Sequence, residues 1–479
     1  MSGDVVGDSR PPGTLRGLAE RTPAYRERWA DLLRAVAILL VVTGHWLAAV
    51  VTYDRGGLDG VHVLEVLGWV HWLSWIFQVM PVFFLVGGFA NAASLGSSRE
   101  RGVGWRDWLL SRTDRLLRPT TAFLVVLAGA AMPARALGAD PELIGRAVWL
   151  ARIPLWFLAV YVGVVVLAPV MYALHRRWGL AVPVVLAVLV GVGDVLRLGF
   201  DVPHGGTANL VLMWLAVHQL GFAWRDGRLP ARRKVALPLL AGGLGCLVLL
   251  TVAGPYPVSM VAVPGAEVQN TSPPTVALLS LAAAQTGLVL LLRDRADRWL
   301  RRPRVWTAVV GVNAVILTVF LWHMTAVVVA AGVLYPTGVF PQPPIGSAEW
   351  IVLRLPWLAF LAIVLAVLMA LFGWIEWRGR LRPARTATPP HRGTHERTYT
   401  ALTIVGLAAA LTGLVGVTLA DPDFHAPTGL PTQALLAYLG GVFILHLMNR
   451  RVTAPTGERT DRVSRGGRRR WCRRPRLPW

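Results

Sequence analysis

The chain has 479 residues, of which 54% are apolar and 15% charged, and its formal net charge is +22. Two cysteines are too few for a disulfide framework, which excludes a disulfide-stabilised scaffold. In a soluble chain so basic a balance would favour nucleic-acid binding, but here the placement of the basic residues has another explanation, and we expect no nucleic-acid partner.

The apolar residues gather in runs of about twenty, the length that a helix needs to cross roughly 30 Å of hydrocarbon. We therefore predict an all-α, polytopic helical membrane protein that is multi-pass in the lipid bilayer of the cell (plasma) membrane. It has about twelve transmembrane helices. In chain order the predicted spans are Leu32–Thr52, Trp69–Leu95, Leu117–Leu137, Ala147–Tyr172, Gly179–Gly199, Thr207–Trp224, Val235–Gly254, Pro274–Leu292, Val305–Leu334, Trp350–Trp377, Thr400–Ala420 and Pro431–Met448.

Lysines and arginines alternate from side to side in step with these spans. If the N-terminus is cytoplasmic, the inner segments hold 41 of the 48, and the outer loops hold only Arg55 and Arg146. The remaining arginines lie inside or at the ends of spans. By the positive-inside rule, both termini are therefore expected to be cytoplasmic.

The segments outside the spans are short. Residues 1–30 form a basic cytoplasmic segment without the apolar core and cleavage site of a removable signal peptide. Residues 31–377 hold ten helices, 378–399 form an Arg-, Pro- and Thr-rich cytoplasmic linker, and 400–448 hold two additional helices. The Arg-rich tail, 449–479, is expected to lie against anionic lipid. Since no loop can hold a soluble catalytic domain, we expect any chemistry to take place in the helical bundle.

Two ionisable residues in the first span share one helix face. Arg34 and His45 are eleven residues apart, which is about three full turns at ~100° per residue, and they are separated by ~16 Å along the axis. Ionisable groups inside a membrane are costly and are functional candidates by default. The register predicts one elongated ligand that is held at two points, an anion at the cytoplasmic rim and a reacting group deeper in the membrane.

A second basic cluster lies between the second and third spans. The segment WRDWLLSRTDRLLRP alternates charged and bulky apolar residues, which is typical of an amphipathic helix lying on the bilayer. Arg112 and Arg115 lie one turn apart on the same side, and guanidinium pairs suit phosphate. The alternative is a positive cluster that contacts lipid headgroups.

An acyl-coenzyme A fits these parts. Its phosphates would bind the cytoplasmic arginines, its pantetheine arm would follow the first helix, and its thioester would reach His45. An imidazole is a suitable general base for a hydroxyl that attacks the thioester.

The chain resembles the integral-membrane acyltransferase 3 family, which O-acylates sugars and other hydroxylated compounds. The resemblance rests on a series of motifs in order, over about Asp31 to Trp377. They are Arg34 and His45 within DLLRAVAILLVVTGHW, the segment MPVFFLVGGFANA, Arg112 and Arg115, the WFL of Trp156 to Leu158 and the FLWH of Phe320 to His323. The final two helices lie outside the resemblance.

The resemblance implies an O-acyltransferase with His45 as the catalytic histidine and Arg34, Arg112 and Arg115 as donor-binding residues. Gly87 stands where the family usually has serine, which favours direct transfer from donor to acceptor over a seryl intermediate at this position. We expect acyl-CoA as co-substrate, no tightly bound cofactor and no metal. The acceptor is a hydroxyl of a sugar, cell-surface glycan or small metabolite. Because the chain lacks the extracellular hydrolase-like domain of some relatives, a separate outer acyl-handling partner is an alternative to transfer by the bundle alone.

Several other residues are candidates for supporting roles. His323 lies near mid-membrane, where it either faces His45 across the bundle or packs beside Trp322. Asp31 lies about 21 Å from His45 along the helix, too far to orient that imidazole, so it is expected to order the arginines. The sequence does not choose among the carboxylates that could serve His45, which are Asp194, Glu349 and Glu376.

Two other functions compete with an acyltransferase. Twelve helices with both ends inside is also a common layout of secondary transporters, in which buried Arg and His bind an anionic solute or relay protons. The two halves of this chain share no corresponding motifs, however, and a division into ten plus two helices does not fit a six-plus-six repeat. A lipid-interacting scaffold leaves the register of Arg34 and His45 unexplained.

Overall fold

The structure is a computed structural model, and it describes residues 15–23, 26–54, 57–380, 394–421 and 426–453. Its first elements are α1 (Leu15–Glu20), α2 (Arg28–Ala48), β1 (Ala49–Asp54), β2 (Gly57–His62), α3 (Val63–Val66), η1 (Gly68–Leu73), α4 (Ser74–Phe77), α5 (Met80–Glu100), α6 (Trp105–Ala136), α7 (Pro141–Arg152) and α8 (Leu155–Trp178). They are followed by α9 (Ala181–Asp194), η2 (Val195–Gly199), α10 (Asn209–Arg225), α11 (Arg233–Val252), α12 (Val276–Trp299), α13 (Pro303–Ala314), α14 (Ile316–Leu334), α15 (Ala348–Arg380), α16 (Thr394–Leu419) and α17 (Thr432–Thr453).

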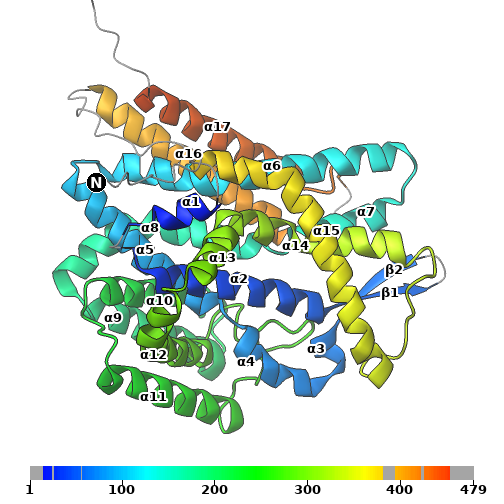
Figure 1. The fold of residues 1–479 in the computed structure, drawn as a ribbon, viewed down its shortest axis with the longest axis horizontal. Coiled ribbons are helices and arrows are strands. Elements are labelled where there is room, and N and C mark those ends of the chain that lie inside the picture. Colours follow the sequence, from blue (N-terminus) through cyan, green and yellow to red (C-terminus); the bar gives the residue numbers. More distant parts are fainter. Residues whose placement is uncertain (1–14, 24–25, 55–56, 381–393, 422–425, 454–479) are drawn as a thin grey trace, which may run out of the picture.

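The prediction of an all-α polytopic membrane protein is confirmed. Among the described residues, eleven helices are long and apolar enough to cross a membrane. The sixth of the twelve predicted spans coincides with α10, which has 17 residues and is shorter than those eleven. Figure 1 shows the helices packed around α2, α5 and α14 in the middle of the bundle.

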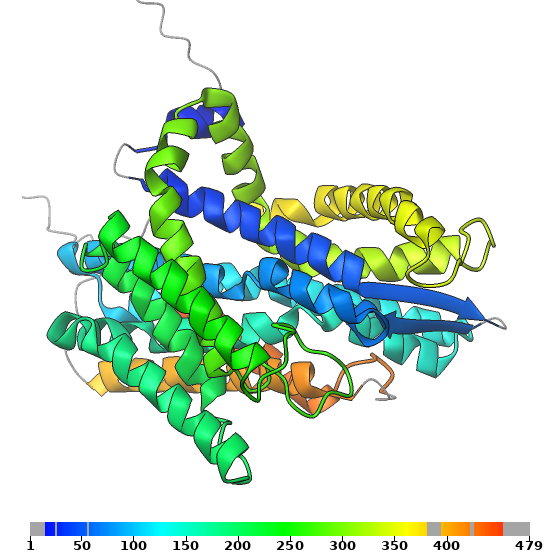
Figure 2. The same cartoon turned by 90° about the horizontal axis from the view of Figure 1, so that it is seen from below.

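A two-stranded hairpin that was not predicted follows α2 directly. β1 and β2 pair antiparallel, with Ala49 opposite His62. Figure 2 shows α2 leading straight into this hairpin at the edge of the molecule, while its other end lies near α1 and α13. We call the end of the bundle near Arg28 and Arg34 the arginine end and the end at Ala49–His62 the hairpin end.

The amphipathic segment before the third span is not a separate helix on the bilayer surface. Residues 105–119 form the first half of α6, which continues without a break to Ala136 over 32 residues. Pro119 lies inside this helix and does not interrupt it. The side chains of Arg112 and Arg115 are therefore carried on the same rigid element as the third span.

The predicted ninth span, Val305–Leu334, is broken between α13 and α14 at Val315. The first turn of α14 gains a cap from the next span, because the Glu376 carboxylate on α15 accepts hydrogen bonds from the backbone N–H of Thr318 at 2.9 Å and from its hydroxyl at 3.0 Å. A carboxylate here satisfies otherwise free N–H groups and complements the helix dipole. The break and the cap together set the position of α14 and of the histidine that it carries.

Helices α5 and α10 are in backbone contact. A Cβ on Gly88 would collide with the carbonyl of His218, and one on Gly221 would collide with the backbone of Leu85. Only glycine permits this approach, as is common for helix pairs in membranes. The contact brings polar side chains of α5 and α10 together in the interior.

The final helices, α16 and α17, lie along one side of the bundle beside α6 and α8 (Figure 1). Arg152, which is 3% exposed, donates to the carbonyls at the end of α16, including Val417 at 2.5 Å and Thr418 at 3.0 Å. On α17, the Tyr438 hydroxyl donates to the Leu117 carbonyl of α6 at 3.1 Å. The pair is therefore docked on the ten-helix core by buried polar contacts.

Candidate functional site

Two histidines meet in the middle of the bundle. His45 Nδ1 on α2 lies 2.8 Å from His323 Nε2 on α14, and their rings are stacked with centroids 5.0 Å apart. His323 is fully buried, whereas His45 is partly exposed. The Trp46 indole donates to the His323 carbonyl at 2.9 Å and joins the same two helices. The structure thus brings together the two histidines that the sequence analysis considered as partners.

The hydrogen bonds around this pair assign its protons. His323 Nδ1 lies 2.7 Å from the Phe320 carbonyl, which can only accept, so Nδ1 carries the proton and donates. In a neutral imidazole the other nitrogen is then an acceptor, and His323 Nε2 accepts from His45 Nδ1–H. His45 is left with its lone pair on Nε2. This is the form of histidine that can remove a proton from a hydroxyl.

The three predicted arginines also come together. The Arg112 guanidinium is hydrogen-bonded to the Tyr161 side chain, and both Arg34 and Arg115 are near enough to repel it electrostatically. Arg34 is 29% exposed by side chain, and Arg115 is exposed. Among the described residues, the Asp31 carboxylate pairs with Arg34, whereas Arg112 and Arg115 have no ion pair. The cluster therefore keeps an excess of positive charge that would attract a polyanion such as a nucleotide phosphate chain.

Asp31 links the arginines to a cavity at the same end of the bundle. Its carboxylate accepts from Arg26 Nε at 2.6 Å and from Arg34 at 3.3 Å. Asp31 thus contacts Arg34, one of the arginines that it was predicted to order. The cavity has a volume of ≈ 180 Å³, and its lining includes Thr22, Arg26, Asp31, Trp306, Asn313 and Trp377.

A row of aromatic side chains joins the histidines to the arginines. The Phe320 ring lies 6.1 Å from that of His323 and 5.4 Å from that of Phe157, which stacks on Tyr161 at 5.7 Å. Tyr161 in turn holds Arg112. The WFL and FLWH segments therefore supply neighbouring parts of one wall.

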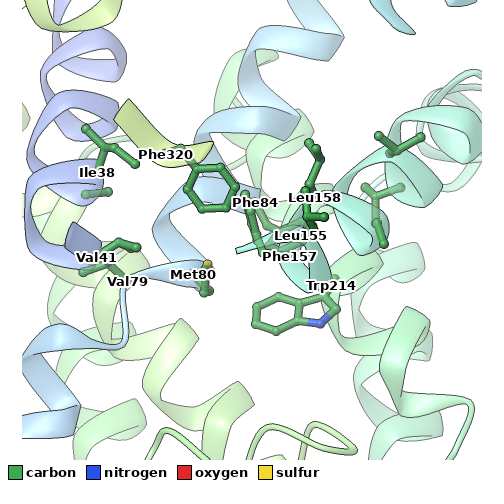
Figure 3. Close-up of a cluster of buried hydrophobic side chains, with 14 of the residues drawn as sticks. Ile38, Val41, Val79, Met80, Phe84, Leu155, Phe157, Leu158, Trp214 and Phe320 are labelled. Atoms are coloured by element: carbon green, nitrogen blue, oxygen red, sulfur yellow. The ribbon is translucent and has the colours of Figure 1, made fainter. Parts of the chain in front are cut away.

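The face of α2 between Arg34 and His45 is packed against this wall. Ile38 is 1% and Val41 4% exposed, and both belong to the same buried apolar cluster as Phe84 and Phe320 (Figure 3). The register of the two ionisable residues on one face agrees with the sequence analysis. In this structure, however, apolar side chains fill the space along which a ligand arm would run.

Gly87 lies against Tyr161. A Cβ at this position would be 3.0 Å from Tyr161 Cε2 and 3.2 Å from its hydroxyl oxygen. The tyrosine thus occupies the space that a serine side chain at this position would need. It brings a hydroxyl to the same neighbourhood from α8.

Three polar residues were not predicted from the sequence, two of which interact with Arg112 while the third is hydrogen-bonded to one of these two. One is Tyr161, and the others are Asn91 and His218, which are completely buried and hydrogen-bonded to each other at 3.0 Å. His218 also experiences the charge of Arg112. The available signal was a polar residue in an otherwise apolar span, together with Gly88 and Gly221 at the helix contact.

Other predicted supporting residues have contacts elsewhere. The Trp322 ring stacks on Phe372 of α15 at 4.1 Å. Asp194 accepts from Tyr256 at 2.9 Å and from the N–H of Val276 at 2.7 Å, so it caps α12. As described above, Glu376 caps α14. Within the described ranges, no group of three or more His, Cys, Asp or Glu side chains is arranged to hold a metal ion.

The fold and the site define a class of protein: a polytopic membrane protein with a histidine pair inside the bundle and an arginine cluster at one end of it. The chain belongs to the acyltransferase 3 family, because the family model described as an acyltransferase domain matches residues 27–377. The protein is therefore a membrane acyltransferase. No curated protein and no solved structure matches the chain.

Proposed function

We propose that this protein is an O-acyltransferase that takes a short acyl group, such as acetyl, from acyl-CoA. The acceptor is a hydroxyl of a sugar, a cell-surface glycan or a small metabolite. One observation carries the proposal: a single helix, α2, presents Arg34 to the arginine cluster and His45 Nε2 as a free base further along the same face.

In this proposal the arginine end faces the cytoplasm of the cell. The donor phosphates bind Arg34, Arg112 and Arg115, and the nucleotide end occupies the neighbouring cavity, which shares Asp31 with Arg34. The pantetheine arm follows α2, displacing the side chains at Phe320 and Ile38, and the thioester reaches His45. The roughly 16 Å between Arg34 and His45 suits the extended arm.

The chemical step needs no seryl intermediate. The acceptor oxygen forms a bond to the acyl carbon and gives its proton to His45 Nε2, while the C–S bond breaks and the thiolate leaves with the electron pair. His45 then returns the proton to the thiolate. His323 acts as a positioning residue, because it holds the His45 proton on Nδ1.

His45 is three residues from the end of α2, next to the hairpin. We therefore propose that the acceptor arrives from the hairpin end, on the outer side of the membrane, either free or supplied by a separate partner. The donor and the acceptor then approach the same imidazole from opposite faces.

The first experiment measures binding of acetyl-CoA to the full-length protein in nanodiscs, with acetyl-pantetheine as the probe that lacks the nucleotide. Wild type should bind acetyl-CoA more tightly, and Arg34→Ala and Arg115→Ala should lose most of that preference. His45→Ala should retain binding but lose the thiol release that wild type shows when acetyl-CoA and a hydroxylated acceptor are both present. If wild type binds neither probe up to millimolar concentrations, the proposal is wrong, and a transporter of an anionic solute becomes the better hypothesis.

A further inference from the structure

In the described part of the chain, two arginines are buried at or inside the spans, and they differ in their surroundings. Arg152 donates to four carbonyl oxygens of α16 and of the residues that follow it. Arg354, on α15, is 9% exposed, and its Nε has no hydrogen-bond partner among the described residues. Arg152 therefore has the contacts of a structural residue, whereas Arg354 does not.

The aromatic neighbours of Arg354 do not satisfy its N–H groups. Its guanidinium lies over the Trp350 ring at 4.2 Å, which neutralises one face of the planar group but leaves its donors in the plane. Tyr335 is the other neighbour. Burial raises the pKa of its phenol while Arg354 opposes this, so Tyr335 is a neutral group and supplies no counter-charge at neutral pH.

Further unpartnered donors occur on the same helix face. Trp350 and Trp357 lie four residues before and three residues after Arg354, so all three side chains share one face of α15. The indole N–H groups of both tryptophans are buried and have no acceptor among the described residues. These three side chains offer buried donors that have no acceptor among the described residues, which complements an anionic oxygen group.

This face lies at the hairpin end, close to the end of α2. Trp350 packs in one cluster with Val50, Val63 and Leu64, and Val50 is five residues beyond His45. Arg354 is one helical turn further into the bundle than Trp350, or about 6 Å. The unpartnered donors are thus near the route by which an acceptor would approach His45 from this side.

We propose that Trp350, Arg354 and Trp357 form a binding site for a phosphate or carboxylate group carried by the acceptor. The identification of this ligand as the acceptor rests on the function proposed above. The anionic group ties the acceptor to α15 while its hydroxyl is presented to His45. Such a site selects acidic sugars, sugar phosphates or the phosphate of a lipid carrier over neutral sugars.

Binding to the full-length protein in phosphatidylcholine nanodiscs tests this site, with glucose 1-phosphate and methyl glucuronide as anionic probes and methyl glucoside as the neutral match. Wild type should prefer at least one anionic probe by about tenfold. Arg354→Gln should abolish the preference, and Arg354→Lys should keep part of it. A parallel arm compares phosphatidylglycerol with phosphatidylcholine retained on the purified protein, which distinguishes a lipid phosphate from a soluble one.

The matched control is Arg146→Gln, because Arg146 is an exposed arginine at the hairpin end with an ion pair to Asp59. It should leave the preference intact. Thermal stability without anions gives a second readout: removing a buried, unpartnered charge should leave the Tm of Arg354→Gln equal to or above that of wild type. A structural arginine would give a large fall.

The site is disproved if wild type shows no preference for anionic over neutral ligands in either arm, if Arg354→Gln retains the preference, or if its Tm falls sharply. Binding of acetyl-CoA is measured on the same preparations. If wild type binds acetyl-CoA but shows no preference for anionic ligands, this inference alone is refuted. Anion binding without acetyl-CoA binding would refute the proposed donor and leave the anion site standing.

Discussion

The histidine pair owes its properties to a backbone carbonyl. Because the Phe320 carbonyl can only accept, the proton of His323 lies on Nδ1. His323 Nε2 then accepts from His45 Nδ1–H, which leaves His45 Nε2 without a proton. A carboxylate in place of His323 would also orient His45, but an additional buried negative charge would be costly inside a membrane. A neutral imidazole at position 323 orients the His45 ring without that cost.

Substitution of His323 tests this orienting role. In the presence of a hydroxylated acceptor, we expect His323→Ala to lower the rate of thiol release from acetyl-CoA about a hundredfold with little change in donor KM, because His45 loses the acceptor for Nδ1–H. His323→Gln should recover part of the rate, since its amide oxygen can accept from Nδ1. A raised KM with an unchanged rate would instead mean that His323 binds the donor.

Gly87 gives a second prediction at this scale. Since a Cβ would approach Tyr161 to 3.0 Å, Gly87→Ala should shift this tyrosine and disturb its hydrogen bond to Arg112. A strain of ~1 kcal/mol corresponds to about fivefold weaker binding of acetyl-CoA. Gly87→Ser should weaken binding similarly in an equilibrium binding assay. Tighter binding by the serine variant would show that the added hydroxyl contributes a contact of its own.

At the residue scale, the sequence predicted those parts of the site that depend on a single helix. The register of Arg34 and His45, and that of Arg112 and Arg115, follow from helical periodicity alone. The contacts of Tyr161, Asn91 and His218 depend on how α5, α8 and α10 pack, which no local pattern encodes. His323 was found as a candidate, but its distance to His45 required the positions of α2 and α14.

Among the elements, the largest differences from the sequence analysis concern where helices begin and break. The hydropathy pattern predicted one continuous span across α13 and α14, and another across α7 and α8, because the residues at both breaks are themselves mostly apolar. The same pattern predicted that residues 105–119 form a helix separate from the third span. The reason is that charged residues become rare after position 118, although the helix continues. The hairpin Ala49–His62 was missed since it directly continues an apolar helix.

The docking of α16 yields a prediction at this scale. Arg152→Ala should lower the apparent Tm of the purified protein, because several buried carbonyls at the end of α16 lose their donor, at a cost of about 2 kcal/mol or more. The Tm of Arg152→Lys should lie between those of wild type and Arg152→Ala, because the lysine ammonium is compact and has only three donors. Exposed Arg146→Ala is the control. An unchanged Tm in Arg152→Ala would mean that these contacts do not hold the helix pair.

On the scale of the whole molecule, α10 decides the topology of everything that follows it. At ~1.5 Å per residue its 17 residues span about 26 Å, less than the hydrocarbon core. Most of its side chains are buried between other helices. A helix surrounded by protein has little contact with lipid, so its length need not match the bilayer. We therefore expect α10 to cross the membrane, as the positive-inside pattern requires.

Cysteine labelling on intact cells tests this crossing. Val202 and Arg228 are exposed residues just before and just after α10. In a background with Cys246→Ser and Cys472→Ser, we expect a membrane-impermeant maleimide to label Val202→Cys on intact cells and Arg228→Cys only after permeabilisation. Labelling of both, or of neither, on intact cells would place them on the same side. That result would contradict a crossing by α10 and the orientation that the basic residues predict for α11 and all later helices.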